Sequence, residues 1–199
     1  MSVIVPRVIL ASTSRYRHEL LARILPTFEA VAPDVDETAL PDETVTATAL
    51  RLSIDKALAV ASRHPDAIVI GGDQLAELDG EPIGKPGNFD NALAQLRRLR
   101  GRDVQFHSGI CLLDGPNQRR RDAVVSTRVR FRELPDQDLA DYLRIDEPWD
   151  CAGSARAEAL GITIVEAIES DDPTALIGLP LITIAGWLRE TGYPMYATR

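Results

Sequence analysis

The chain has 199 residues, 45% of them hydrophobic and 26% charged, with a formal net charge of −8. This length predicts a single domain over residues 1–199, with two intimate lobes and no separable linker. The negative charge argues against a broad nucleic-acid surface and favours a small phosphorylated ligand. There is no membrane-length apolar run, no signal-peptide pattern and no zinc-like cysteine spacing, so we expect a cytoplasmic protein.

The use of lysine is unusual. Lys56 and Lys85 are the only lysines, and the other twenty of the 22 basic residues are arginine. A lysine kept against such a background indicates a site that needs a compact ammonium group. The acidic motif GGDQ, residues 71–74, lies between them in sequence, and this arrangement suggests a phosphate-handling site. The alternative is that both are surface lysines left by a drift toward arginine.

Strands and helices alternate in the predicted first half of the chain. Apolar runs predict strands at 5–10, 28–33 and 67–74. Apolar periodicity predicts helices at 15–25 and 44–63, the second with Thr44 as its N-cap. An acidic loop with Asp34, Asp36 and Glu37 follows the second strand, and residues 75–85 are typical of a hairpin that turns at Asp79-Gly80.

The second half begins with a helix capped by Asn88 and ending before Gly101. Residues 103–115 and 119–134 predict a long hairpin, whose second strand places Ala123, Val125, Thr127, Val129 and Phe131 on one face. The remaining expectations are a helix at 135–145, an irregular stretch at 147–161, a strand at 162–168, a loop at 170–178 and a closing helix from Leu179. The pattern is α/β, a mixed twisted β-sheet with flanking helices.

The polar loop after the first strand is a candidate phosphate site. Hydroxyls such as that of Ser12, together with free amides at a helix N-terminus, bind anions. Arg17 shares a helical stripe with Leu20, Leu21 and Ile24, so its side chain is expected to point into the protein. A half-buried arginine needs an anion. The alternative is an ordinary capped helix with an internal salt bridge.

Candidate metal ligands follow two strands. Asp73 is expected at the carboxyl end of a buried strand, where a carboxylate could hold a divalent metal or orient a water. Asp36 and Glu37 follow another strand, and oxygen ligands from two strand ends suit Mg²⁺ or Mn²⁺. Lys56 lies on an apolar helical stripe and should lean inward. Alternatively, Asp73 simply begins a hairpin.

Taken together, these segments resemble the Maf family of nucleoside triphosphate pyrophosphatases. The resemblance runs nearly end to end, and it rests on ILASTSRYRHELL, APDVDE, RLSIDKA, GGDQ, IGKP, CAGS and IGLPL. It implies hydrolysis between the α- and β-phosphates, giving a nucleoside monophosphate and pyrophosphate with a divalent metal cation, Mg²⁺ or Mn²⁺. It also implies a two-lobed fold around a cleft, similar to the inosine triphosphatase architecture, and often a homodimer.

The resemblance implies roles for individual residues. The positions that match the family's catalytic centre are Ser12, Arg17, Glu37, Lys56, Asp73 and Lys85. The three cations would neutralise the triphosphate and the leaving pyrophosphate. Ser12 would hold phosphate oxygens. Glu37 and Asp73 would bind the metal, and Asp73 would also polarise the attacking water.

The motif details resemble the branch that acts on 7-methyl-GTP, with specificity positions at Tyr16, Gln74 and Glu158. N7-methylguanine is cationic, so an aromatic face and a carboxylate suit it. That branch often has Pro-Trp where this chain has Arg15-Tyr16, which predicts looser selectivity. The alternatives are a pyrophosphatase for dTTP, UTP or other nucleotides, or a nucleotide-binding regulator of septum formation.

Overall fold

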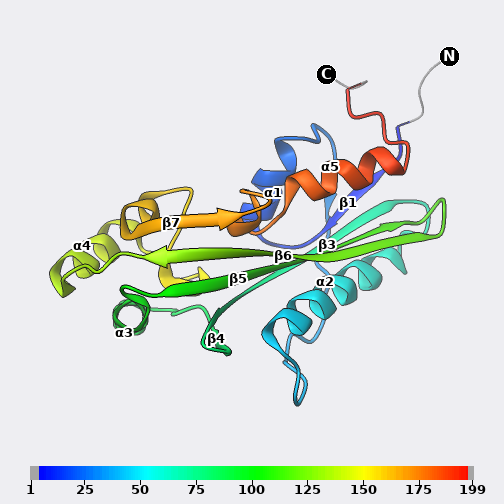
Figure 1. Ribbon diagram of the computed structural model, residues 1–199. Coiled ribbons are helices and arrows are strands. Elements are labelled where there is room, and N and C mark those ends of the chain that lie inside the picture. The colour runs from blue at the N-terminus through cyan, green and yellow to red at the C-terminus, as the bar shows by residue number, and fades with distance from the viewer. Residues whose placement is uncertain (1–4, 197–199) are drawn as a thin grey trace. The chain divides into compact units, whose positions relative to one another are not determined.

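The computed structural model describes residues 5–196, which form a seven-stranded sheet with five α-helices (Figure 1). The strands are β1 (Val8–Ala11), β2 (Glu29–Ala30), β3 (Ile68–Leu78), β4 (Glu81–Ile83), β5 (Asp103–Asp114), β6 (Arg119–Phe131) and β7 (Val165–Ser170). The helices are α1 (Arg15–Ala22), α2 (Val45–Ala61), α3 (Phe89–Leu99), α4 (Asp136–Asp146) and α5 (Leu181–Glu190). Short 3-10 helices are η1 (Ala152–Ser154), η2 (Leu160–Ile164) and η3 (Ala175–Ile177).

The sheet is mixed, and the predicted α/β class is confirmed. The strand order is β2-β1-β3-β5-β6-β7, with β4 paired to β3. β1 pairs in parallel with β2 and β3, whereas β3 with β4 and β6 with β7 are antiparallel. The chain divides into two compact units: 1–74, 108–125 and 172–199 form the first, and 75–107 and 126–171 the second. Whether they make one domain, as the sequence suggests, stays a prediction.

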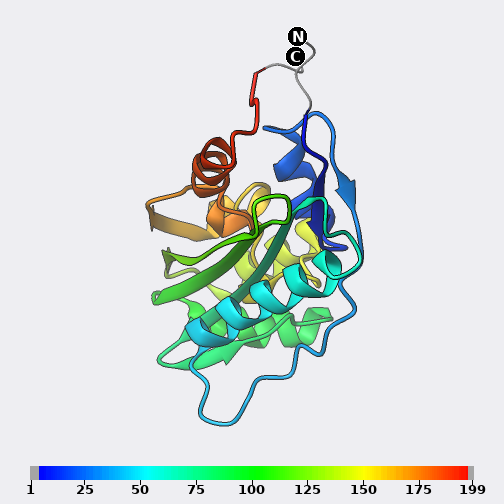
Figure 2. The same ribbon diagram turned by 90° about the vertical axis from the view of Figure 1, so that its right-hand side faces the viewer.

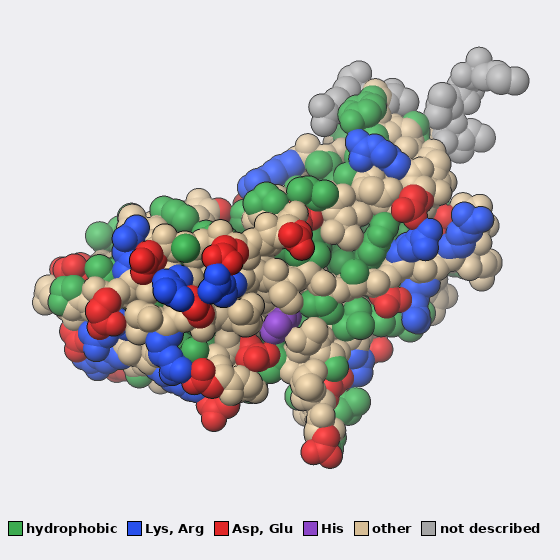
Figure 3. Space-filling view, in the orientation of Figure 1, with side chains coloured by type: hydrophobic (Ala, Val, Ile, Leu, Met, Phe, Trp, Pro, Cys, Tyr) green, Lys and Arg blue, Asp and Glu red, His purple; other side chains and the backbone are tan. Residues whose placement is uncertain are grey.

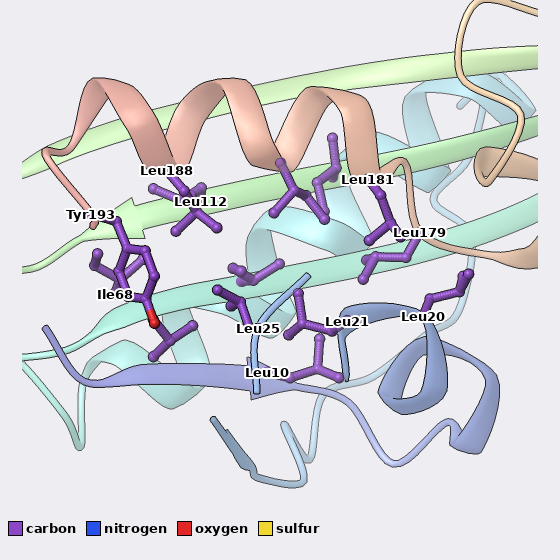
Figure 4. Packing of buried hydrophobic residues seen from close by; sticks show 14 of the residues in the cluster. Leu10, Leu20, Leu21, Leu25, Ile68, Leu112, Leu179, Leu181, Leu188 and Tyr193 are labelled. Atoms are coloured by element: carbon purple, nitrogen blue, oxygen red, sulfur yellow. The ribbon is translucent and has the colours of Figure 1, made fainter. Parts of the chain in front are cut away.

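In the first unit, helices cover both faces of β1 and β3 (Figures 1 and 2). Successive strand residues face opposite ways, so Leu10 and Ile70 pack with α1 and α5, while Ile9 and Val69 pack with α2. Figure 4 shows the α1 and α5 side of this core, where leucines of both helices meet β1, β3 and β5. The core therefore fixes the two helices that carry Arg17 and Lys56.

The close approach of α2 to the sheet depends on glycine. A Cβ on Gly71 would lie 2.2 Å from the carbonyl oxygen of Ser53, and one on Gly109 would lie 2.1 Å from that of Ala49. Only glycine lets strand and helix backbones meet this closely. Thr44 caps the helix by accepting from the amide of Ala47, as predicted. This close packing sets the distance between β3 and the part of α2 that carries Lys56.

In the second unit, α3 and α4 pack together, and their buried residues include Leu96, Leu99, Leu139 and Leu143. Asn88 caps α3, as expected from the sequence. The alternation predicted for β6 is confirmed for Thr127, Val129 and Phe131, which are buried, whereas Ala123 and Val125 are only partly buried.

The outward arginines of β6 are paired with acids. Arg128 binds Glu169 of β7, and Arg130 binds Asp103 of β5 at 2.6 Å. Figure 3 shows basic and acidic side chains interspersed over this part of the molecule. Over residues 5–196, none of the helices combines the length and the apolar character needed to span a membrane.

Several predicted elements differ from the structure. The strand expected at 5–10 runs over Val8–Ala11, the helix expected at 15–25 ends at Ala22, and the closing helix begins at Leu181. The strand expected at 28–33 is reduced to Glu29–Ala30, because β2 pairs only with Ile9 and Leu10 of β1. The strand expected at 67–74 continues to Leu78, because its second part pairs with β4. The strand expected at 162–168 runs over Val165–Ser170 beside β6, after η2.

Candidate functional site

The loop after β1 folds tightly around its hydroxyl groups. Ser14 is the N-cap of α1 and accepts from the amide of Arg17. Ser12 is buried, and its Oγ accepts from the amide of Ser14 at 3.1 Å. A hollow of about 310 Å³ lies beside this loop, lined by Ser12, Thr13, Ser14, Arg15, His18, Glu19, Ala30 and Ala32. The loop has the hydroxyls and helix N-terminus that favour an anion.

Lys56 lies between two carboxylates. Its Nζ is 2.6 Å from Asp73 Oδ1 and 2.6 Å from Glu37 Oε1. Lys56 and Asp73 are only 5% and 6% exposed, whereas the side chain of Glu37 is 61% exposed. The predicted inward lean of Lys56 is therefore confirmed, and three of the predicted site residues meet at one point.

The positions of the two acids differ from the expectation that both follow strand ends. Asp73 lies inside β3, two residues after Gly71, the last β3 residue that pairs with β1. Asp73 thus lies beyond the part of β3 that pairs in parallel with β1, and β3 continues to Leu78. Glu37 lies in the long loop before α2 and not at the end of β2. It reaches Lys56 because the loop returns toward the helix.

The two carboxylates fit a hard divalent cation. Both oxygens lie 2.6 Å from one nitrogen, so they lie within twice that distance of each other. Mg²⁺ is commonly bound by one or two carboxylates together with substrate phosphates. Residues 5–196 contain no cluster of three or more His, Cys, Asp or Glu side chains arranged for a metal. Glu37 and Asp73 are the pair that could hold one.

Arg17 lies partly buried against the opposite face of β3. Its Nε donates to the carbonyl of Gly178 at 3.0 Å, and a Cβ on Gly72 would lie 3.6 Å from the same nitrogen. Burial lowers the pKa of Arg17, while the charges of Asp73 and Glu37 act to raise it. Within residues 5–196 its terminal guanidinium nitrogens have no hydrogen-bond partner. They remain available for an anion, and the phosphate-binding role of Arg17 stays a prediction.

Two of the residues predicted to read the base are already engaged. The guanidinium carbon of Arg15 lies 4.7 Å from the ring centre of Tyr16, and Arg15 also donates to the Tyr16 hydroxyl. The side-chain nitrogen of Gln74 donates to Ser108 Oγ and to the carbonyls of Ala175 and Leu176. These contacts restrict what either side chain can offer a ligand.

Lys85 and Glu158 belong to the second unit, and both are exposed. Lys85 follows β4, in a loop held by bonds to the carbonyls of Gly84 and Pro86. Within residues 5–196 it makes no ion pair. Glu158 follows Arg156, which binds the buried carboxylate of Asp146 at 2.9 Å. The segments that carry both residues are thus fixed within their own unit.

Sequence reasoning missed the segment from Asp172 to Gly178, which it treated as a plain loop. Asp172 is buried and accepts from the amides of Ile182 and Thr183, and Thr174 accepts from that of Leu181. Asp172 and Thr174 lie nine and seven residues before the start of α5, whose N-cap is Pro180, so no local capping signal marked this function. The contact of Gly178 with Arg17 had no local signal.

A family model and curated relatives both match nearly the whole chain. A family model described as Maf-like protein matches residues 7–191. A 7-methyl-GTP pyrophosphatase of Cupriavidus pinatubonensis is 54% identical over 192 residues, covering 96% of each chain. One of Burkholderia pseudomallei is 56% identical over 194 residues, covering 96% of this chain and 90% of that protein.

Two solved structures match this chain with TM-scores of 0.45 and 0.46. The Staphylococcus aureus Ham1 protein has a TM-score of 0.45 at 22% identity, covering 64% of this chain and 72% of that one. A Vibrio cholerae protein has a TM-score of 0.46 at 13% identity, covering 97% and 95%.

Proposed function

This chain belongs to the Maf family, and on that premise we propose that it is a nucleoside triphosphate pyrophosphatase that prefers 7-methyl-GTP. It would hydrolyse the bond between the α- and β-phosphates to give a nucleoside monophosphate and pyrophosphate. The structural observation that carries the proposal is the buried Lys56 between Glu37 and Asp73. The preference for 7-methyl-GTP rests on relatives of that name that are 54% and 56% identical.

We propose that Glu37 and Asp73 hold Mg²⁺ or Mn²⁺. Their oxygens converge, and carboxylates with phosphate oxygens are the ligands that these ions prefer. Such an ion supplies charge neutralisation at the phosphates and polarises a phosphoryl oxygen. Lys56 would keep the two acids together and face the phosphate charge with a compact ammonium.

The other residues would bind and orient the triphosphate. Arg17, fixed at Nε, would direct its two terminal nitrogens to phosphate oxygens, and Ser12 with its loop amides would bind further oxygens. Lys85 would stabilise the charge that develops on the leaving pyrophosphate. Asp73 binds Lys56 through Oδ1, so its Oδ2 is the atom suited to accept a proton from the attacking water.

The remaining assignments come from the family resemblance. Tyr16 would stack on the base and Glu158 would accept from its N–H groups. Because Arg15 already lies over the Tyr16 ring, a cationic base would have to displace it or share the ring. A cytoplasmic location and a homodimer likewise remain proposals.

Two substitutions test the proposed function. Asp73→Asn and Lys85→Ala should each abolish pyrophosphate release from 7-methyl-GTP, because each removes a charge that the reaction needs, while thermal unfolding shows a folded protein. Asp79→Asn is a matched control, since Asp79 is exposed in the β3–β4 turn. Near-normal turnover of both test variants on every nucleotide would show that the proposed centre is wrong.

A further inference from the structure

The second unit contains a buried ion pair to which the proposed reaction gives no role. Arg156 Nε donates to Asp146 Oδ2 at 3.0 Å, and a terminal nitrogen of the same guanidinium lies 2.9 Å from Asp146 Oδ1. Only 21% of the Arg156 side chain and 5% of the Asp146 side chain are exposed. A buried charge is costly unless it is paired, so the two side chains must stay together in the folded protein.

The same guanidinium also closes the end of α4. Asp146 is the last residue of α4, and its backbone carbonyl accepts a further hydrogen bond from Arg156. The last carbonyls of a helix lack partners within the helix and carry partial negative charge. Arg156 therefore binds both the side chain and the backbone of one residue, and these bonds fix the position and direction of its guanidinium.

Tyr142 and Ser154 complete the anchor. The Tyr142 hydroxyl lies 3.0 Å from Asp146 Oδ2 and 3.1 Å from the carbonyl oxygen of Ser154. Burial raises the pKa of Tyr142 and the charge of Asp146 raises it further, so the hydroxyl keeps its proton and remains a donor. Ser154 is buried, and its Oγ donates to Gln95 Oε1 of α3 at 2.6 Å. The segment just before Arg156 is thus tied to both α3 and α4.

Glu158 lies in the short loop that leaves this anchor. The amide of Ala159 donates to the carbonyl of Arg156 at 3.0 Å, which closes a turn that contains Glu158. A Cβ on Gly161 would lie 2.5 Å from both the backbone nitrogen and the carbonyl oxygen of Arg156, so only glycine lets the chain return this closely. Both ends of the loop therefore rest on Arg156, and a shift of Arg156 would shift the exposed Glu158.

We propose that Asp146 and Arg156 are positioning residues that hold the Glu158 loop on α4 and thereby set how well the enzyme selects a guanine base. The inference rests on the proposed function, in which Glu158 accepts hydrogen bonds from the base. Guanine presents two adjacent donors, its N1–H and its amino group, whereas uracil presents a single N–H. A carboxylate can tell them apart only when its position is fixed. All the residues of this anchor and its loop belong to the second unit.

Arg156→Met tests this role, because methionine keeps much of the apolar stem and loses the charged fork. It should lower kcat/KM about tenfold for 7-methyl-GTP and less than about twofold for UTP. Arg97→Met is the matched control, since it breaks an exposed ion pair with Asp136 in the same unit, and it should change neither value. An equal loss on both nucleotides would overturn the inference, because a general structural defect does not depend on the base.

A second variant avoids an unpaired buried charge. Arg156→Met alone leaves the carboxylate of Asp146 without its cation, which destabilises the fold. The double variant Asp146→Asn/Arg156→Met leaves no buried charge, and the amide oxygen can still accept from Tyr142. It should melt closer to the wild type and show the same base-dependent loss. Wild-type selectivity in the folded double variant would overturn the inference.

A double-mutant cycle asks whether the pair acts through Glu158. In a Glu158→Ala background, Arg156→Met should cause less than about a twofold further loss of kcat/KM for 7-methyl-GTP. Losses that multiply fully would show that Arg156 acts by another route, and the inference would fall.

Hydrogen exchange at the amide of Ala159 gives a readout that does not depend on turnover. Exchange should be slow in the wild type and in Arg97→Met, and faster in Asp146→Asn/Arg156→Met, because the bond to the carbonyl of Arg156 opens more often. Unchanged exchange would overturn the inference. A wild type that releases no pyrophosphate from any nucleotide would instead contradict the proposed function, and the exchange measurement would still test whether the pair holds the loop.

Discussion

Lys56 illustrates how a single side chain can need one particular cation. Its ammonium lies 2.6 Å from both Glu37 and Asp73, in a position where only 5% of the residue is exposed. A guanidinium is planar, larger and directs five donors in a fixed fork, so it cannot replace a compact point charge at the same depth. This difference explains a lysine here in a chain with twenty arginines among 22 basic residues.

The first prediction concerns that exchange. Lys56→Arg should lower kcat/KM on the order of a hundredfold, because the longer side chain pushes the two carboxylates apart. Steady-state kinetics with 7-methyl-GTP measures the effect. The reverse exchange Arg144→Lys, at an exposed ion pair with Asp141, is the control and should change nothing. Wild-type kinetics for Lys56→Arg would contradict the account of Lys56.

Part of the candidate site could be predicted from the sequence. The helical stripes correctly predicted that Arg17 and Lys56 lean inward, because helical period is a local property. The residues that contact Arg17 and Lys56 could not be predicted in the same way. Asp73 meets Lys56 because glycine at 71 lets α2 touch β3, and Gly178 reaches Arg17 across 161 positions of sequence. Such contacts depend on tertiary packing.

At the scale of elements, an ion pair ties the loop before α2 to the helix. Glu43 accepts from Arg51 at 2.7 Å, and Arg51 also donates to the carbonyl of Thr38. The same loop carries Glu37. The hydrogen bonds from Arg51 hold the pKa of Glu43 down to about 2, from an ordinary value of 4.5. The pair therefore steadies the segment from which Glu37 reaches Lys56.

This lowered pKa gives a prediction about pH. A carboxyl group whose pKa falls on folding stabilises the protein above its unfolded pKa, and the stabilisation disappears as the pH falls through the folded pKa. Glu43→Gln should thus lower the melting temperature at pH 7, and the difference from the wild type should shrink between pH 4.5 and about 2. Thermal unfolding at several pH values measures it. A constant difference would contradict the pairing.

The contact between α2 and β3 gives a second prediction at this scale. Gly71→Ala should destabilise the fold by about 1–3 kcal/mol through overpacking, and it should lower activity because α2 carries Lys56. Gly186→Ala is the control, since a Cβ there has no neighbour within 4 Å and alanine favours a helix by about 0.5–1 kcal/mol. Chemical denaturation of both variants compares them; equal stabilities would contradict the close approach.

The sequence predicts elements well where the signal is local. Thr44 and Asn88 mark the starts of α2 and α3, and the alternation of β6 gives its buried face. The sequence does not predict the length of a strand where that length depends on pairing with a neighbouring strand. β2 is short because only two of its residues pair with β1, and β3 is long because β4 extends it past Asp73.

At the scale of the whole molecule, charge and family agree on a small anionic substrate. The net charge is −8, and many surface arginines are paired with acids, as Arg128 and Arg130 are. Two cations of the proposed site differ from these, since Arg17 keeps its terminal nitrogens free within residues 5–196 and Lys85 makes no ion pair there. An acidic protein with few unpaired cations is suited to a small triphosphate and not to a polymer.

The most direct test of the account is kcat/KM for 7-methyl-GTP, GTP, dTTP, UTP and CTP, with Mg²⁺ or Mn²⁺ and with the products identified. We predict that the products are a nucleoside monophosphate and pyrophosphate, that turnover depends on the metal, and that kcat/KM is highest for 7-methyl-GTP. A preference for dTTP would contradict the proposed specificity. Release of a nucleoside diphosphate and phosphate, or no turnover of any of the five, would contradict the central claim itself.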